Sequence, residues 1–210
     1  MRGLREAPFR ERLRRVAAIF DKEGEVYETL LRLTQRFRDH DIEYAIIGGI
    51  ALLAHGYRRA TINVDALITE EGLAAFHSHI EPLGYDPAFE GARKTFVDAV
   101  TGVRVRFMIT GAFPGDRKPK QVRFPEPNEV SVQYDGYRVI TLPKLIELKL
   151  ASGPAPRRMC DFADVQALIE AARIPRELRE QIDESVRTKF DELWDLAQMP
   201  DFHNQGRQTS

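Results

Sequence analysis

The sequence contains a single cysteine, Cys160, among its 210 residues. One cysteine excludes an intramolecular disulfide and is compatible with a reducing compartment, so a cytoplasmic location is expected. No apolar run approaches the roughly 18 residues that a membrane-spanning helix needs, and no membrane partner is expected. No group of Cys and His residues has the spacing of a zinc site. The chain has 31 basic and 32 acidic residues, so no excess of one charge indicates a nucleic-acid or membrane surface as partner.

The composition is that of an ordinary globular protein, with 43% hydrophobic and 30% charged residues. A chain of this length buries a core without a metal or disulfide. We expect one domain with a helical appendage. Residues 1–41 are predicted to form helices packed on the core, 42–152 the core, 153–198 a helical region, and 199–210 a flexible tail.

The first twenty residues hold six arginines, as a transit peptide can. Glu6 and Glu11 interrupt that pattern, and apolar residues such as Leu13 and Phe20 recur at roughly helical spacing. The segment is therefore predicted to be an amphipathic helix that packs on the domain.

Hydrophobic periodicity and turn signals predict the order of the elements. Thr101-Gly102 and Asp135-Gly136 each separate two strand-like runs, which is the signature of a hairpin. Helices are predicted at residues 25–40, 50–55, 70–83, 143–151, 161–172 and 176–196, and strands at 44–47, 62–68, 95–100, 103–109, 130–134 and 137–140. Strands enclosed by helices indicate an α+β or mixed α/β class.

Two short segments indicate an anion site. A buried strand runs directly into Gly48-Gly49 and a following helix, and glycines there let the backbone approach a ligand such as a triphosphate. In the next strand Asn63 and Asp65 lie on the same face, because side chains alternate. Upstream of it, Arg59 is suited to phosphate contacts.

Together these segments resemble the minimal nucleotidyltransferase-fold families, which include nucleotidyltransferase toxins of the abortive-infection type. The resemblance is carried by residues 48–61 with Asn63 and Asp65, then by residues 142–153 and 157–165, in the expected order. It implies a mixed sheet flanked by helices, with C-terminal helices that close a nucleotide cleft. Gly48, Gly49, Arg59 and Thr61 are the residues implied to bind the nucleotide on this side of the cleft.

Two positions depart from the pattern that the resemblance implies. The families carry aspartate at both acidic positions of the strand and usually a third acid on a neighbouring strand; these acids hold Mg²⁺. Here the first position is Asn63, the second is Asp65, and Arg106 is expected at the third if the hairpin is ungapped. Asp98 and Asp135 are the alternatives for the third acid. A hard dication gains little from Asn63, Asp65 and Arg106, and Arg106 itself is suited to the metal's place near phosphate.

The C-terminal motif supplies further candidates. Lys149 resembles a position that contacts nucleotide or supports the cleft. Asp161 and Asp164 are three residues apart and are expected on one helix face. Asp161 is either a helix N-cap or a nucleotide-binding residue, and Asp164 is expected to be a salt-bridge partner.

The function implied is binding of a nucleoside triphosphate. An active protein would transfer NMP to RNA, protein or a small molecule, with Asp65, Asn63 and Arg106 at the catalytic centre and Asp65 as the ligand of Mg²⁺. An antitoxin-like partner is a further implication. The alternative is a catalytically degraded relative that binds nucleotide or a protein partner through the same cleft. His55 and the basic loop of residues 114–120 are expected to be structural and solvated, respectively.

Overall fold

The computed structural model describes residues 24–156 and 158–199. The predicted amphipathic helix of the first twenty residues lies outside the described residues, and so does the predicted tail beyond residue 199. Among the described residues, no helix combines the length and apolar character that crossing a membrane requires.

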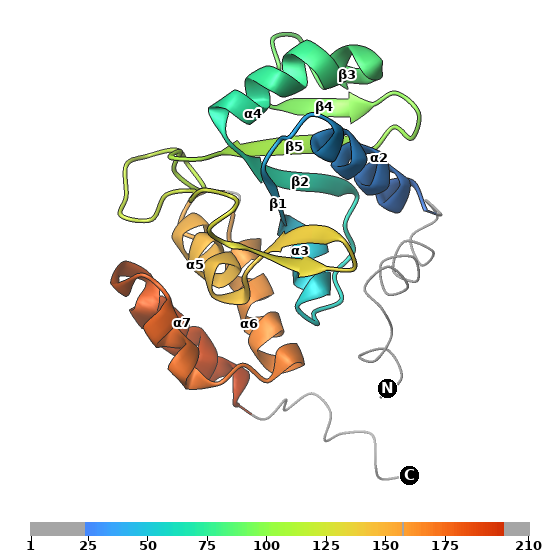
Figure 1. Ribbon diagram of the computed structural model, residues 1–210. Helices are drawn as coiled ribbons and strands as arrows, with labels where there is room; N and C mark the ends of the chain where they lie inside the picture. The colour runs from blue at the N-terminus through green and yellow to red at the C-terminus, as the bar shows by residue number, and fades with distance from the viewer. Residues whose placement is uncertain (1–23, 157, 200–210) are drawn as a thin grey trace, which may run out of the picture.

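Within the described ranges, seven strands form one mixed sheet in the order β3-β4-β5-β2-β1-β7-β6 (Figure 1). Pairing is parallel between β2 and β5 and between β1 and β7, and antiparallel between the other neighbours. The predicted mixed α/β class is confirmed. The strands are β1 (Tyr44–Ile47), β2 (Asn63–Ile68), β3 (Tyr85–Pro87), β4 (Thr95–Asp98), β5 (Arg104–Ile109), β6 (Ser131–Tyr134) and β7 (Tyr137–Ile140).

Helices cover the sheet and extend beyond one of its ends. The α-helices are α2 (Glu25–Asp39), α3 (Gly48–Ala54), α4 (Glu70–Ala75), α5 (Leu142–Ser152), α6 (Cys160–Ala172) and α7 (Glu184–Ala197). A π-helix, η2 (Phe76–Ile80), and two 3₁₀ helices, η3 (Glu81–Leu83) and η4 (Arg176–Gln181), complete the set for the described part of the chain.

One part of the hydrophobic core lies between the sheet and helices α2 and η2, and the same cluster continues through α3 and the C-terminal helices. Leu30, Leu33 and Phe37 of α2 are fully buried, which explains the apolar stripe of that helix. Phe37 contacts the ring of Phe107 on β5, and Phe76 of η2 contacts the same ring from a centroid distance of 4.7 Å. Because side chains alternate along β5, Arg106 points to the opposite face of the sheet.

The C-terminal helices pack on one another. Helix α6 contacts both α5 and α7, and Figure 1 shows the three helices, orange to red, gathered at one end of the sheet. Val165 of α6 and Phe190 of α7 are fully buried between them. The long connection from β5 to β6 reaches this group, because Lys120 Nζ donates to the carbonyl of Ala151 at 3.1 Å.

Two predicted helices differ from the structure in detail. Residues 70–83 are helical throughout, as predicted, but the helix passes from α-helix to π-helix and then to a 3₁₀ turn at Pro82, where proline has no N–H for an α-helical bond. The helix predicted at 176–196 is interrupted at Ile182, which is extended, and α7 begins after Asp183. Both predicted hairpins are confirmed: Asp135 and Gly136 have φ of 47° and 86°, as a tight I′-like turn needs.

Candidate functional site

The bend after β1 lies directly against Asp65. Ile47 pairs with Asp65 across β1 and β2, and the next residue, Gly48, has a φ of 66°. A Cβ atom on Gly48 would lie 2.3 Å from Asp65 Oδ2, far inside van der Waals contact. Glycine is therefore required at position 48 both by its backbone conformation and by the carboxylate beside it. The predicted meeting of the glycine bend with the next strand is confirmed.

The second glycine serves a different contact. A Cβ on Gly49 would lie 2.6 Å from Thr61 Cβ, so the absence of a side chain lets α3 pack on the segment before β2. The Thr61 hydroxyl donates to the carbonyl of Asn63 at 3.1 Å. The contacts of Gly49 and Thr61 are thus internal, and their nucleotide-binding role stays a prediction.

Asp65 and Arg106 form a bidentate ion pair across β2 and β5. Arg106 lies on the strand beside β2, as expected, and it is in register with Asp65. Arg106 Nε donates to Asp65 Oδ1 at 2.6 Å and Nη2 donates to Oδ2 at 2.7 Å. Hydrogen bonding to Asp65, with the field of Asp161, raises the pKa of Arg106 above its ordinary value. The Asp65 side chain is 7% exposed and that of Arg106 is 35% exposed, so the guanidinium is the accessible partner.

The two alternatives for a third acid lie elsewhere. Asp98 is buried at the end of β4 and is ion-paired with Arg32 of α2. Burial alone would raise the pKa of Asp98, but hydrogen bonds from Arg32 and the Val100 backbone lower it below its ordinary value. Asp135 occupies the turn between β6 and β7. Neither residue lines the cavity that contains Asp65.

The residues around Asp65 do not fit a magnesium ion. Both carboxylate oxygens of Asp65 already accept hydrogen bonds from Arg106. Asn63 provides a neutral amide on the same face, and its partner in register is Arg104. No group of three or more His, Cys, Asp or Glu residues within the described ranges is arranged to hold a metal ion. A hard cation that prefers several carboxylate ligands gains little here.

A cavity of about 520 Å³ opens beside this ion pair. Its walls come from β1, β2, β4, β5, the connection after β5, and α5. One part is apolar, with Phe113, Phe124, Leu145 and Leu148. The charged lining is unequal: a single carboxylate, Asp65, accompanies five cationic side chains, Lys94, Arg106, Arg117, Lys149 and Arg158. Such a cavity is suited to a ligand with both an anionic and an apolar part.

Lys149 forms the centre of a buried charge network between α5 and α6. Its Nζ donates to Asp161 at 2.9 Å and to Asp164 at 2.7 Å. Arg158 is ion-paired with Asp161 at 2.7 Å, and Arg59 is ion-paired with Asp164. The expected salt-bridge role of Asp164 and the shared face of the two aspartates are confirmed. This network fixes the C-terminal helices to the segment before β2.

The alternative of Asp161 as an N-cap is wrong. Helix α6 starts at Cys160, its N-cap is Met159, and no side chain caps it. Asp161 lies inside the first turn, and its carboxylate faces Lys149 and Arg158 instead of the free backbone N–H groups. The buried lysine accounts for this, because a charge in the interior needs a partner. His55 is structural as expected: its Nε2 is 2.7 Å from the carbonyl oxygen of Ile140.

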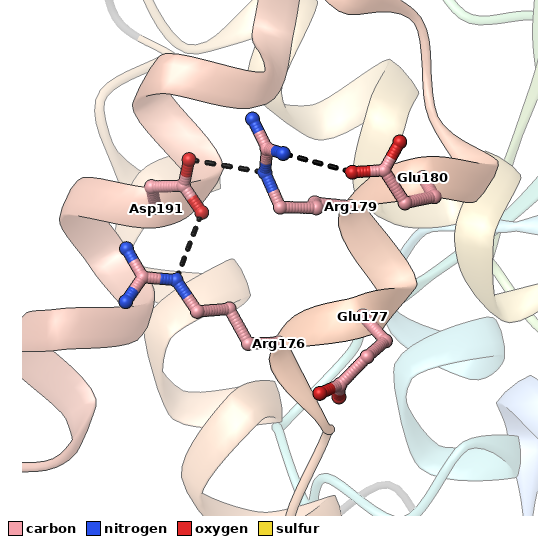
Figure 2. A pocket seen from close by; sticks show the side chains of 5 residues that line it. All are labelled: Arg176, Glu177, Arg179, Glu180 and Asp191. Carbon is pink, nitrogen blue, oxygen red and sulfur yellow. Dashed lines mark hydrogen bonds and ion pairs between the residues drawn. The ribbon is translucent and has the colours of Figure 1, made fainter.

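A second cavity, of about 480 Å³, lies between η4 and α7. Figure 2 shows Arg176 and Arg179 converging on Asp191, and Arg179 also reaching Glu180. The lining of this cavity has three acids and two bases, so it has no excess of positive charge, and it shares no residue with the cavity at Asp65. We therefore place the candidate site at Asp65.

The structure brings together only part of the predicted site. Gly48, Asp65, Arg106 and Lys149 line one cavity, whereas Gly49, Arg59, Thr61, Asn63 and Asp161 do not line it. Sequence reasoning missed Lys94, Arg117 and Arg158 as cavity residues. Arg117 lies in the basic loop that was expected to be solvated, and Arg158 lies in a segment that the resemblance covered without assigning it a role. Lys94 had no signal, because its position depends on β4 pairing with β5.

The comparisons with known proteins agree with this architecture. No protein-family model matches the sequence, and no curated protein matches it. A solved structure of an antigenic nucleotidyltransferase-like protein from Paracoccidioides brasiliensis superposes with a TM-score of 0.52 at 14% identity, over 82% of this chain and 88% of that chain. The chain therefore has a nucleotidyltransferase-like fold.

Two further solved structures are similar to the chain more distantly. ANT(2'')-Ia in complex with adenylyl-2''-tobramycin has a TM-score of 0.48 at 13% identity, over 78% of this chain and 96% of that chain. The STING-associated CdnE c-di-GMP synthase from Capnocytophaga granulosa has a TM-score of 0.35 at 8% identity, over 83% of this chain and 78% of that chain.

Proposed function

We propose that this chain binds a nucleoside triphosphate in the cavity beside Asp65. The observation that carries the proposal is the lining of that cavity, in which five cationic side chains accompany one carboxylate and several apolar side chains. Phosphates are stabilised by guanidinium and ammonium groups, and a base is stabilised by apolar and aromatic contacts. The nucleotidyltransferase-like fold supports the same ligand class.

The lining suggests an orientation for the ligand. The triphosphate would lie along Gly48, Arg106 and Lys149, where a glycine lets it approach the backbone. The base would lie against Phe113 and Leu148 on the apolar wall. Arg117 lines the cavity from the connection after β5, where its side chain is exposed and available for a phosphate oxygen.

Isothermal titration calorimetry with ATP, GTP, CTP and UTP tests the proposal. At least one of the four is expected to bind, and Arg117→Gln is expected to weaken it by up to roughly 5-fold, because an exposed charge pair contributes up to about 1 kcal/mol. The matched control is Lys118→Gln, which removes a charge from the adjacent residue that does not line the cavity. Absence of binding by all four nucleotides, or an equal effect of both substitutions, would contradict the proposal.

Transfer of NMP to an acceptor is a second candidate function, supported by the motif resemblance and the fold together. An acceptor oxygen would attack the α-phosphorus, a new phosphorus–oxygen bond would form, and pyrophosphate would leave. RNA, protein and a small molecule are the proposed acceptor classes, and an antitoxin-like partner belongs to the same proposal. Incubation of cell extract with α-³²P-labelled nucleotides tests it: labelled product that depends on the chain and disappears in Asp65→Ala supports transfer.

A further inference from the structure

The carboxylate of Asp65 is already engaged by a cation of the protein itself, the guanidinium of Arg106. Both of its oxygens accept hydrogen bonds from Arg106, and its side chain is almost completely buried. To bind a dication, Asp65 would have to release the guanidinium, and a bidentate charge-assisted pair in a buried setting resists that exchange. A dication placed beside the retained guanidinium would be repelled by it.

Arg106, in contrast, keeps donors for a ligand. Its Nε and Nη2 donate to Asp65, and no other described residue accepts a hydrogen bond from it among the contacts found. The side chain lines the cavity and remains partly accessible. The planar geometry of the pair fixes the guanidinium, and Gly48 lines the same cavity as Arg106.

We infer that Arg106 takes the place of a metal ion in this site and binds the phosphates directly, with Asp65 as the residue that positions its guanidinium. The inference rests on the proposed function and adds to it that binding is independent of divalent metal. Asn63 agrees with this role, because a neutral amide on the same face adds no charge that would attract a cation. Asp65 is thereby a positioning residue and not a metal ligand.

The two roles of Asp65 predict opposite effects when Arg106 is removed. If Arg106 binds phosphate, Arg106→Gln weakens nucleotide binding by roughly 10-fold or more, as loss of a charged hydrogen-bond donor does. If Asp65 is a metal ligand, the same substitution frees it and strengthens Mg²⁺-dependent binding. Arg106→Lys keeps the charge and one ion pair if Arg106→Gln does not fold, and it is expected to weaken binding because the planar fork is lost. Thermal unfolding monitors the fold of each variant.

The titrations use the tightest of the four nucleotides, in EDTA and in excess MgCl₂. Wild-type affinity is expected to differ by less than roughly threefold between the two conditions. Arg104→Gln is the matched control, because Arg104 lies on the same strand and face, in register with Asn63, and does not line the cavity. It is expected to bind like wild type. Binding that requires Mg²⁺, or that improves in Arg106→Gln, overturns the inference.

A metal titration without nucleotide separates this inference from the proposed function. Electron paramagnetic resonance with Mn²⁺ is expected to show no ion bound at Asp65, with identical spectra for wild type and Asp65→Asn. The double variant Asn63→Asp/Arg106→Asp is expected to gain a bound Mn²⁺, because three carboxylates then share one face of β2 and β5. If the wild type binds Mn²⁺ and Asp65→Asn abolishes that binding, Arg106 does not replace a metal ion. This conclusion holds whichever nucleotides bind. If the double variant folds but binds no Mn²⁺, Arg106 does not occupy the position of a metal ion.

Discussion

Gly48, a residue without a side chain, determines how the charged residues of the candidate site are arranged. Gly48 carries neither charge nor side chain, yet its missing Cβ is what allows the Asp65 carboxylate to lie against the end of β1. The carboxylate in turn holds Arg106 at the cavity wall. A glycine directly after β1, an acid within β2 and a base within β5 therefore form one unit, and a change in any of them is expected to affect the other two.

Gly48→Ala is expected to destabilise the protein by clearly more than about 1 kcal/mol, since it adds a Cβ collision to the strain of a positive φ. It is also expected to weaken nucleotide binding, because the displaced carboxylate no longer orients Arg106. Chemical denaturation and calorimetry measure the two effects. Gly102→Ala is the control: Gly102 has a φ of 70° but no atom within 4 Å of an added Cβ, so the variant carries the strain alone. If both variants lose the same free energy of unfolding, the added Cβ at position 48 does not collide with Asp65.

At the scale of elements, the chain between α6 and α7 shows how a helix is divided. Residues 176–196 have the periodicity of one helix, but the structure forms η4, an extended Ile182, and then α7. Asp183 caps α7, because its carboxylate accepts from the Ser185 backbone N–H at 2.9 Å. Hydrogen bonds from Ser185 lower the pKa of Asp183. The backbone N–H of Asp183 donates to Glu147 of α5 at 2.9 Å, which joins the break to the helix that lines the cavity.

Asp183→Ala is expected to reduce the free energy of unfolding by about 1 kcal/mol, the usual cost of a lost N-cap. Urea denaturation monitored by circular dichroism gives the value. Asp183→Asn keeps an oxygen that accepts the same hydrogen bond, so its free energy of unfolding is expected to fall much less. If alanine and asparagine are equally destabilising, charge rather than capping is the contribution of Asp183.

At the scale of the whole molecule, buried ion pairs join parts of the chain that are distant in sequence. Lys149 links α5 to α6, and Arg32 links α2 to the end of β4 through Asp98. The second pair lies near Tyr85, whose pKa burial and the charge of Asp98 raise to about 12. These pairs fix the relative positions of the helices that the hydrophobic core alone would leave less defined.

The Asp98 pair predicts an acid-dependent stability. Folding lowers the pKa of Asp98 below its ordinary value of 3.8, so the folded state holds the proton less readily than the unfolded state. The contribution to stability is fully present above the ordinary pKa and is lost as pH falls through the lower, folded-state pKa. Wild type is therefore expected to be more stable than Asp98→Asn at pH 7, with a difference that shrinks below about pH 4. Urea denaturation across this range measures it, with exposed Asp86→Asn as control; a constant difference would contradict the linkage.

Much of the fold could be predicted from local pattern. The Asp135-Gly136 turn, the apolar strand before Gly48 and the stripe of α2 each carry their own signal within a few residues. The resemblance placed Arg106 at the third acidic position, so a departure from a carboxylate cluster could be expected before the structure. Its pairing with Asp65 depends on β2 lying beside β5. The change from α-helix to π-helix and 3₁₀ helix within residues 70–83 was missed, although Pro82 was a signal for it.

The sequence by itself determined the order of the elements, the glycine bend and the identity of Asn63, Asp65 and Arg106, because each depends on neighbouring residues or on one hairpin. Only the tertiary structure decided which of the candidates share a cavity. Arg59 and Asp161 join the Lys149 network outside the cavity, Arg158 joins the same network and lines the cavity, and Arg117 and Lys94 line the cavity from other segments. The physical reason is that the direction of a long charged side chain depends on the charges that other segments bring within reach, and that information is not present in any local stretch of the chain.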